Sequence, residues 1–241
     1  MTSIDYGDIA RLGVLLPSGN SVAEAELYGM LPAGVALNVT RLRLTGSSET
    51  ELMGMLDSLE DAASLLADAR PDRIAFHCTA VSTFAPHLAP AIKARIETAS
   101  NLPAFSTADA IVAALTTLNA RKVMLVTPYI EAVHAREISF LDSIGAKAVS
   151  GGWLDVATNA EMARIAPETI RDLVRVCAIG VRADVCFISC TAIRSAGLIA
   201  PLEAELGMPV ITSNQVMLWH GLRLMGVGGA VAGYGRLFGE G

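Results

Sequence analysis

Short apolar segments rich in β-forming residues alternate along the chain with amphipathic segments, and this alternation constrains the fold more than any other feature. The strand-like segments are residues 11–16, 36–44, 73–78, 104–106, 122–127, 146–153, 184–190 and 210–212. The helix-like segments between them include residues 51–69, 92–99, 108–118, 132–144 and 167–179. Strand alternating with helix is typical of parallel sheets that carry helices on both faces. The sequence therefore predicts an α/β fold.

The order of these segments repeats, because the first four strand-like segments and the last four follow the same rhythm. We predict two pseudosymmetric lobes, each a parallel four-stranded sheet flanked by helices, with the active site in the cleft between them. The first lobe is expected to comprise residues 1–110 and 213–241, and the second residues 111–212. The last apolar helix, 215–225, is expected to pack back onto the first lobe.

The tripeptide Cys-Thr-Ala occurs twice, at residues 78–80 and 190–192, each time where an apolar strand is expected to run into a helix. In open parallel sheets, ligands bind at the carboxyl ends of the strands. One strand-end cysteine alone is more often a small buried hydrophobe than a catalyst. Two of them at equivalent places in two halves predict a site with one sulfur on each side of a substrate. We therefore expect Cys78 and Cys190 to be the catalytic residues.

A cysteine acts as nucleophile or base only as a thiolate, and a helix amino terminus lowers the thiol pKa through its free N–H groups and dipole. The hydroxyl and backbone N–H groups after each cysteine can also hold a substrate carboxylate, which stabilises an enolate-like intermediate. His77 precedes Cys78 directly, so strand alternation points it to the opposite face, where a packed or surface role is the better interpretation.

Three further loops follow expected strands and contribute candidates. The amide of Asn20 and the phenol of Tyr129 can each donate to a carboxylate. Ser21 and Glu24 have the spacing of a helix-capping box. Asn159 lies in a polar loop, where a turn or cap is the better interpretation from the residues alone. The full set of candidate substrate-binding residues is Ser18, Asn20, Thr79, Ala80, Tyr129, Asn159, Thr191 and Ala192.

Composition excludes several classes of function. The net charge is -6 and no basic run exists, which argues against a nucleic-acid surface. No apolar run approaches the length that spans a bilayer, so no membrane partner is expected. The acidic start lacks a secretory signal, and a cytoplasmic location is expected.

The motifs of the common cofactor sites are also missing from the sequence. The four cysteines follow no disulfide framework, which fits a reducing compartment. No cluster of cysteine and histidine completes a metal site, and no H-E-x-x-H motif occurs. The glycine-rich tail is neither a dinucleotide fingerprint nor a P-loop. Neither a metal nor a nucleotide cofactor is expected.

Five motifs resemble the aspartate/glutamate racemase superfamily, in its branch of maleate cis-trans isomerases and arylmalonate decarboxylases. The resemblance covers essentially the whole chain. The motifs are Leu-Pro-Ser-Gly-Asn at 16–20 with Glu24, Val-Thr-Pro-Tyr at 126–129, the loop 155–159, Ile-Ser-Cys at 188–190, and the ending at 233–238.

The resemblance implies two pseudosymmetric α/β lobes, a site in the cleft between them, and no metal or organic cofactor. The decarboxylases have Gly in place of the first cysteine, whereas this chain has both. Carried over from the isomerases, Cys78 is the nucleophile that adds to a double bond and Cys190 the proton donor. Asn20, Tyr129 and Asn159 hold the carboxylates of a small carboxylate or dicarboxylate substrate. A homo-oligomer is compatible with the superfamily.

One departure keeps alternatives open. The isomerases tend to have bulky apolar residues after each cysteine, whereas Thr79 and Thr191 follow here. Cys-Thr is the racemase pattern, and the decarboxylases also place a hydroxyl residue after their first-lobe position. A racemase or decarboxylase working through an enediolate is therefore the alternative, including a role in ectoine-type catabolism, to which the segment 209–220 is similar. A non-catalytic small-acid-binding protein is the third hypothesis.

Overall fold

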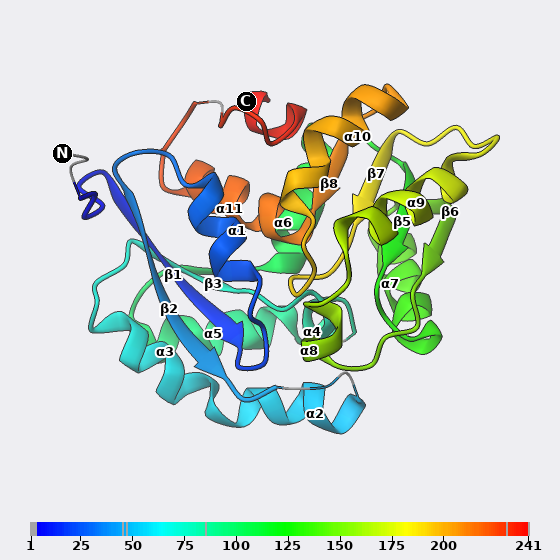
Figure 1. The fold of residues 1–241 in the computed structure, drawn as a ribbon. Helices are drawn as coiled ribbons and strands as arrows, with labels where there is room; N and C mark the ends of the chain where they lie inside the picture. The colour runs from blue at the N-terminus through cyan, green and yellow to red at the C-terminus, as the bar shows by residue number, and fades with distance from the viewer. Residues whose placement is uncertain (1–3, 45, 47, 85, 230, 241) are drawn as a thin grey trace.

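The computed structural model describes residues 4–44, 46, 48–84, 86–229 and 231–240, and it contains two parallel four-stranded sheets (Figure 1). The first has the strand order β2-β1-β3-β4 and the second β6-β5-β7-β8. The identical orders confirm the predicted α/β fold of two similar halves. The strands are β1 (Ala10–Pro17), β2 (Val35–Leu42), β3 (Arg73–Phe76), β4 (Ala104–Ser106), β5 (Lys122–Thr127), β6 (Lys147–Trp153), β7 (Val185–Ile188) and β8 (Val210–Thr212).

Both central strands end earlier than the sequence predicts. β3 stops at Phe76 and β7 at Ile188, so Cys78 and Cys190 lie in the loops that follow and not in the strands. The reason is that the neighbouring strands end there too, since Phe76 pairs with Ser106 and Ile188 pairs with Thr212, the last residues of β4 and β8. Each cysteine thus begins the turn at the carboxyl end of its sheet.

Helices connect and cover the strands. Those of the first half are α1 (Ala23–Met30), α2 (Glu49–Gly54), α3 (Leu59–Ala67), α4 (Thr79–Phe84), α5 (Ala89–Ser100) and α6 (Thr107–Thr117), with 3-10 turns η1 (Met55–Ser58) and η2 (Pro86–Leu88). Those of the second half are α7 (Glu131–Ser143), α8 (Asn159–Met162), α9 (Pro167–Ala178), α10 (Ile199–Leu206) and α11 (Ser213–Leu224), with η3 (Ala196–Leu198) and η4 (Arg236–Gly239). The helix expected over 51–69 is divided into α2, η1 and α3. Among the described residues, no helix has the length and apolarity that a bilayer crossing requires.

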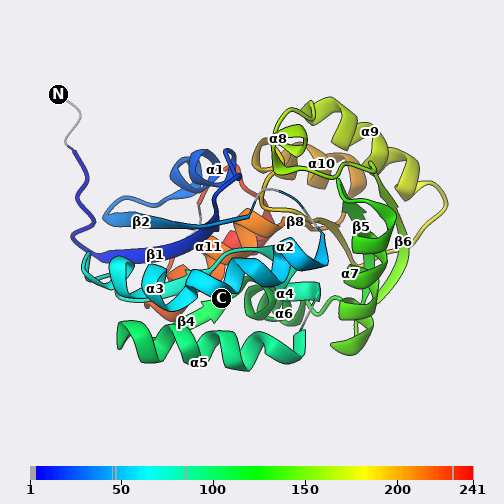
Figure 2. The same cartoon turned by 90° about the horizontal axis from the view of Figure 1, so that it is seen from below.

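α6 and α11 occupy equivalent places after β4 and β8, and they pack against each other between the two sheets (Figures 1 and 2). Each starts with a capping box, formed by Ser106 with Asp109 and by Thr212 with Gln215. At Gly221 of α11, an added Cβ would come within 3.1–3.2 Å of side chains of β1 and β4. α11 therefore lies directly against the first sheet.

The two cysteines belong to different hydrophobic cores. Cys78 is part of the core that β3 forms with α2, α3 and α5, and Cys190 is part of the core that β7 forms with α9 and α10. Ala80, in the first turn of α4, packs against both cores. The first Cys-Thr-Ala segment therefore lies where the two halves meet.

Candidate active site

Cys78 directly precedes α4 and is buried. Its sulfur accepts hydrogen bonds from the backbone N–H groups of Ala80 and Val81, as expected for a thiol at a helix amino terminus. Burial nevertheless raises the pKa of this thiol to about 12, because desolvation outweighs the two N–H groups. The helix amino terminus therefore lowers the pKa of Cys78, as the sequence predicts, but burial raises that pKa by more.

Cys190 is buried as well, but its backbone differs. Its φ of 133° lies in a region that favours glycine, and residues 191–193 form a turn and a bend before η3 begins at Ala196. The expected helix directly after the second cysteine is thus wrong. The sulfur of Cys190 accepts from the backbone N–H of Ala192 at 3.2 Å and from the phenol of Tyr129, and it lies 3.8 Å from Met162 Sδ. The backbone N–H of Cys190 donates to Ser213 Oγ at 3.0 Å.

The two thiols and Tyr129 form one buried group. Burial raises the pKa of Cys190 to about 12, and a charge on Cys78 raises it further. Burial likewise raises the pKa of Tyr129 well above its usual value, and charges on Cys190 and Cys78 act in the same direction. The structure therefore brings together three of the residues that the sequence predicts for the site.

Two hydroxyl groups of α4, the helix that begins directly after Cys78, lack a hydrogen-bond partner among the described residues. They are the buried Thr79 Oγ1 and Ser82 Oγ. A buried hydroxyl without a partner costs free energy unless a ligand or water satisfies it. Thr79 was predicted for the site, whereas Ser82 was not. Its position three residues after Thr79 on a helix is the signal that could have identified it.

Asn20 is buried and joins the two halves. Its Oδ1 accepts from the backbone N–H groups of Val22 and Ala23 at 2.9 and 3.0 Å, and its Nδ2 donates to Thr191 Oγ1 at 2.9 Å. Asn20 thus caps the start of α1 from two residues before the N-cap position, Val22, which makes no side-chain cap bond itself. The prediction of a capping box at Ser21 is wrong, because the carboxylate of Glu24 pairs with Arg41 instead.

Ser18 and Asn159 both form hydrogen bonds with the backbone of Leu44. The exposed Ser18 accepts from the backbone N–H of Leu44 through Oγ at 3.0 Å. Asn159 Nδ2, half-buried, reaches the carbonyl of Leu44 at 3.5 Å across the two halves. Asn159 begins α8 and is not its cap, which is Thr158.

A buried polar network holds the loop that follows Cys190. The sequence did not predict this network. His77 Nε2 lies 2.8 Å from Asn214 Oδ1, and Asn214 Nδ2 donates to Glu26 Oε2 at 2.7 Å and to the carbonyl of Thr191 at 3.3 Å. Glu26 in turn accepts from the backbone N–H of Ala196 at 2.8 Å. Burial lowers the pKa of His77 to about 4, so it is neutral and packed, as predicted.

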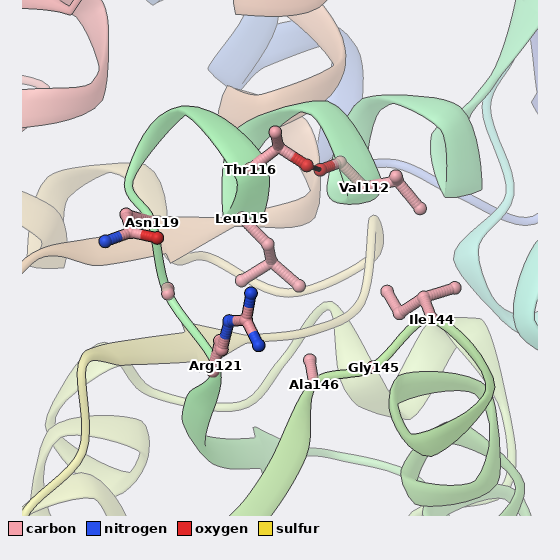
Figure 3. A pocket seen from close by; sticks show the side chains of 9 residues that line it. Val112, Leu115, Thr116, Asn119, Arg121, Ile144, Gly145 and Ala146 are labelled. Atoms are coloured by element: carbon pink, nitrogen blue, oxygen red, sulfur yellow. Dashed lines mark hydrogen bonds between the residues drawn. The ribbon is translucent and has the colours of Figure 1, made fainter.

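A separate cavity of about 280 Å³ lies at the opposite end of the second sheet (Figure 3). It is lined by residues of α6 and of the segments just before β5 and β6, including Leu115, Asn119, Arg121 and Ile144. These segments mark the amino ends of the strands, whereas both cysteines lie at carboxyl ends. The cavity is therefore not part of the candidate site. In the described part of the chain, no three His, Cys, Asp or Glu side chains lie close enough to hold a metal ion.

Known proteins are similar to this chain over most of its length. The profile of the arylmalonate decarboxylase family matches residues 12–238. A maleate isomerase from Nocardia farcinica is 30% identical over 240 residues and covers 95% of each chain. An arylmalonate decarboxylase from Bordetella bronchiseptica is 33% identical over 153 residues, which is 62% of this chain and 63% of its own.

Solved structures agree with this result. The Nocardia farcinica maleate cis-trans isomerase bound to Tris matches with a TM-score of 0.89 at 28% identity, covering 95% of this chain and 98% of that one. A mutant of the same enzyme, with a covalently bound succinylcysteine intermediate, matches with a TM-score of 0.87 at 27% identity over the same shares. Sequence and fold both confirm the resemblance, and the chain belongs to the arylmalonate decarboxylase family.

Proposed function

We propose that the protein is a cofactor-independent cis-trans isomerase of a small dicarboxylate such as maleate. The observation that carries this proposal is the buried group of Cys78, Cys190 and Tyr129, which supplies one sulfur from each half. The succinylcysteine intermediate of the related isomerase supports covalent chemistry at a cysteine of such a site. The presence of both cysteines fits an isomerase better than a decarboxylase that uses only one.

The reaction needs one thiolate and one thiol. The Cys78 thiolate forms a C–S bond to one alkene carbon, and the π electrons move onto the adjacent carbon and its carboxylate as an enediolate. The Cys190 thiol then protonates that carbon and becomes a thiolate. Rotation about the new C–C single bond follows. Cys190 removes a proton from the same carbon, the C–S bond breaks, and the trans alkene leaves with Cys78 again a thiolate.

Hydrogen-bond donors around the thiols would hold the carboxylates. Asn20 has a second N–H on Nδ2, and the Thr191 hydroxyl keeps its proton free because Oγ1 accepts from Asn20. We assign these two groups and Tyr129 to substrate binding, with Asn159 at the rim of the site. Donors that strengthen as charge develops on a carboxylate lower the barrier to the enediolate.

The remaining candidates act around those donors. Thr79 offers its unpartnered hydroxyl, and Ala80 and Ala192 stabilise the two thiolates through the backbone N–H groups that they donate to the sulfurs. Ser18 already bonds Leu44, so we assign it to shaping the rim.

The test is conversion of maleate followed by proton NMR, combined with trapping. We expect wild-type enzyme to form fumarate, and we expect Cys190→Ser to accumulate a succinyl adduct on the peptide that contains Cys78. Cys186→Ser is the matched control, because Cys186 is buried within β7 and outside the site. If the enzyme formed no fumarate and Cys190→Ser formed no adduct, the isomerase proposal would be contradicted.

Racemisation or decarboxylation through an enediolate is the second candidate. The unpartnered Thr79 hydroxyl beside Cys78 favours it, because such a donor can stabilise an enediolate formed without an alkene. Deuterium incorporation at Cα of amino or aryl acids, or carbon dioxide release from a malonate, would identify it. Ligand binding without any turnover would instead leave the binding-protein hypothesis.

A further inference from the structure

Glu137 is a completely buried carboxyl group that the proposed reaction does not use. It lies on α7, where its Oε1 accepts a hydrogen bond from Ser189 Oγ. Its Oε2 has no hydrogen-bond partner among the described residues. Burial raises the pKa of Glu137 to about 7, with the Ser189 bond acting in the opposite direction. A buried carboxyl costs folding free energy, so an apolar residue would pack here at lower cost.

The partner of Glu137 stands next to the second catalytic cysteine. Ser189 is the residue before Cys190, and its backbone N–H donates to the carbonyl of Val126 at 2.9 Å. The chain then turns at Cys190 with its positive φ. The Glu137–Ser189 bond therefore holds the point at which the chain leaves β7, and with it the start of the Cys190 turn.

The charge of Glu137 also distinguishes the two thiols. A negative Glu137 raises the pKa values of Cys190 and Tyr129. The pKa of Cys78 responds instead to burial and to the N–H groups of Ala80 and Val81, which favour the thiolate. A negative Glu137 therefore favours the thiol form of Cys190, while burial raises the pKa of both thiols to about 12.

We propose that Glu137 is a positioning residue that reserves Cys190 for the proton-donor role, by fixing Ser189 and by placing a negative charge near the Cys190 sulfur. The inference rests on the proposed function, because only a reaction with distinct nucleophile and acid needs unequal thiols. Without Glu137, either cysteine could carry the thiolate, and a fraction of the enzyme would hold the proton on the wrong sulfur.

Few other ionisable groups surround Glu137. Tyr129 and Cys190 face it from the loops after β5 and β7. His134, one turn earlier on α7, bonds Thr127 Oγ1 at 3.0 Å. α4 packs against α7, and its residues, Thr-Ala-Val-Ser-Thr-Phe, include no carboxylate, imidazole, thiol or amine. β6 packs against α7 as well, and its one ionisable residue, Lys147, is exposed. A change of charge at Glu137 should therefore be felt mainly by Tyr129 and Cys190.

The test measures the pH dependence of iodoacetamide alkylation at each cysteine by peptide mass spectrometry. In Glu137→Gln, which keeps the shape and an acceptor for Ser189, we expect Cys190 to react about tenfold faster at pH 8, the change that one pKa unit gives. Alkylation of Cys78 should change by less than about twofold, on the same scale. The matched control is Glu131→Gln, an exposed carboxyl on the same helix, which should change neither.

Wild-type enzyme provides a second measurement, which stands even if Glu137→Gln does not fold. As Glu137 ionises near pH 7, the rise of Cys190 alkylation with pH should flatten and then resume, whereas Cys78 should rise without this step. Equal alkylation of Cys190 in wild type and Glu137→Gln, or a rise without the step, would overturn the inference. Alkylation needs no maleate, so failure to form fumarate would contradict the proposed function separately.

Discussion

Asn20 Nδ2 donates to Thr191 Oγ1 at 2.9 Å, and this bond joins residues 171 positions apart from the two halves of the protein. Both side chains are buried. The same Asn20 also caps α1 through Oδ1, so one amide fixes the loop after β1, the first turn of α1 and the Thr191 hydroxyl. A side chain that serves three partners cannot be replaced without loss of more than one contact.

We expect the bond between Asn20 and Thr191 to be measurable as a coupling energy. Asn20→Ala and Thr191→Val should each destabilise the protein, and the double variant should show an interaction energy of about 1 kcal/mol, typical of one buried hydrogen bond. Urea unfolding of the four proteins measures it. Strictly additive losses would show that the bond contributes nothing. Asn20→Ala should in addition raise KM for the dicarboxylate, because it removes a carboxylate donor.

Cys190 occupies a backbone conformation that costs energy for any residue except glycine. We therefore expect Cys190→Gly to be more stable than Cys190→Ala by about 1 to 2 kcal/mol, the range of strain for such a residue. Both variants lose the thiol and should be inactive, so thermal unfolding is the measurement. Cys186, inside β7, supplies the control, since Cys186→Gly should there be less stable than Cys186→Ala. The same order at both positions would refute the strain at Cys190.

The phenol of Tyr129 donates to the Cys190 sulfur and lowers its pKa. In Tyr129→Phe we expect the pKa of Cys190 to rise, since its thiolate loses a donor, and kcat/KM to fall about tenfold to hundredfold. Donation of the proton from Cys190 to the substrate carbon should suffer most, because a thiol of higher pKa is a weaker acid. The measurement is a pH–rate profile, whose alkaline limb should move to higher pH. Tyr28→Phe is the control, because that side chain on α1 is exposed and its loss should leave the profile unchanged.

Glu137 makes stability depend on pH. Its pKa is raised from 4.5 to about 7, so the folded state favours the neutral carboxyl. The stabilising effect of that neutral form is complete below pH 4.5 and is lost as the pH rises through 7. As the pH rises from 4.5 to 8, we expect the unfolding free energy of Glu137→Gln to increase relative to wild type by on the order of 2 to 3 kcal/mol.

The measurement for this prediction is the difference in unfolding free energy between the two proteins at each pH. The difference cancels the opposite effect of His77, whose pKa of about 4 makes the folded state lose stability as the pH falls below 6.5. A difference that stays constant from pH 4.5 to pH 8 would show that Glu137 does not titrate in this range.

The pattern of the chain was sufficient to predict the sheets. All eight strands lie within the predicted apolar segments or within two residues of them. Strands such as β5 and β7 are buried on both faces and need an apolar run of their own, whereas β6 has no buried residue. The repeat of Cys-Thr-Ala was sufficient to select Cys78 and Cys190, since equivalent strand ends in two similar halves must face related positions. Local sequence also carries the capping boxes of α6 and α11.

Tertiary structure decided what surrounds those cysteines. Ser189 meets Glu137 across 52 positions, and His77 meets Asn214 across 137, and no local pattern encodes such distances. The cap of α1 fell to Asn20, although Ser21 and Glu24 have the better local spacing, because Glu24 is drawn to Arg41 on β2. The thiol pKa depends on desolvation, which is summed over neighbours from distant segments. The sequence by itself predicted two thiols at equivalent strand ends, and only the fold decided which side chains surround each of them.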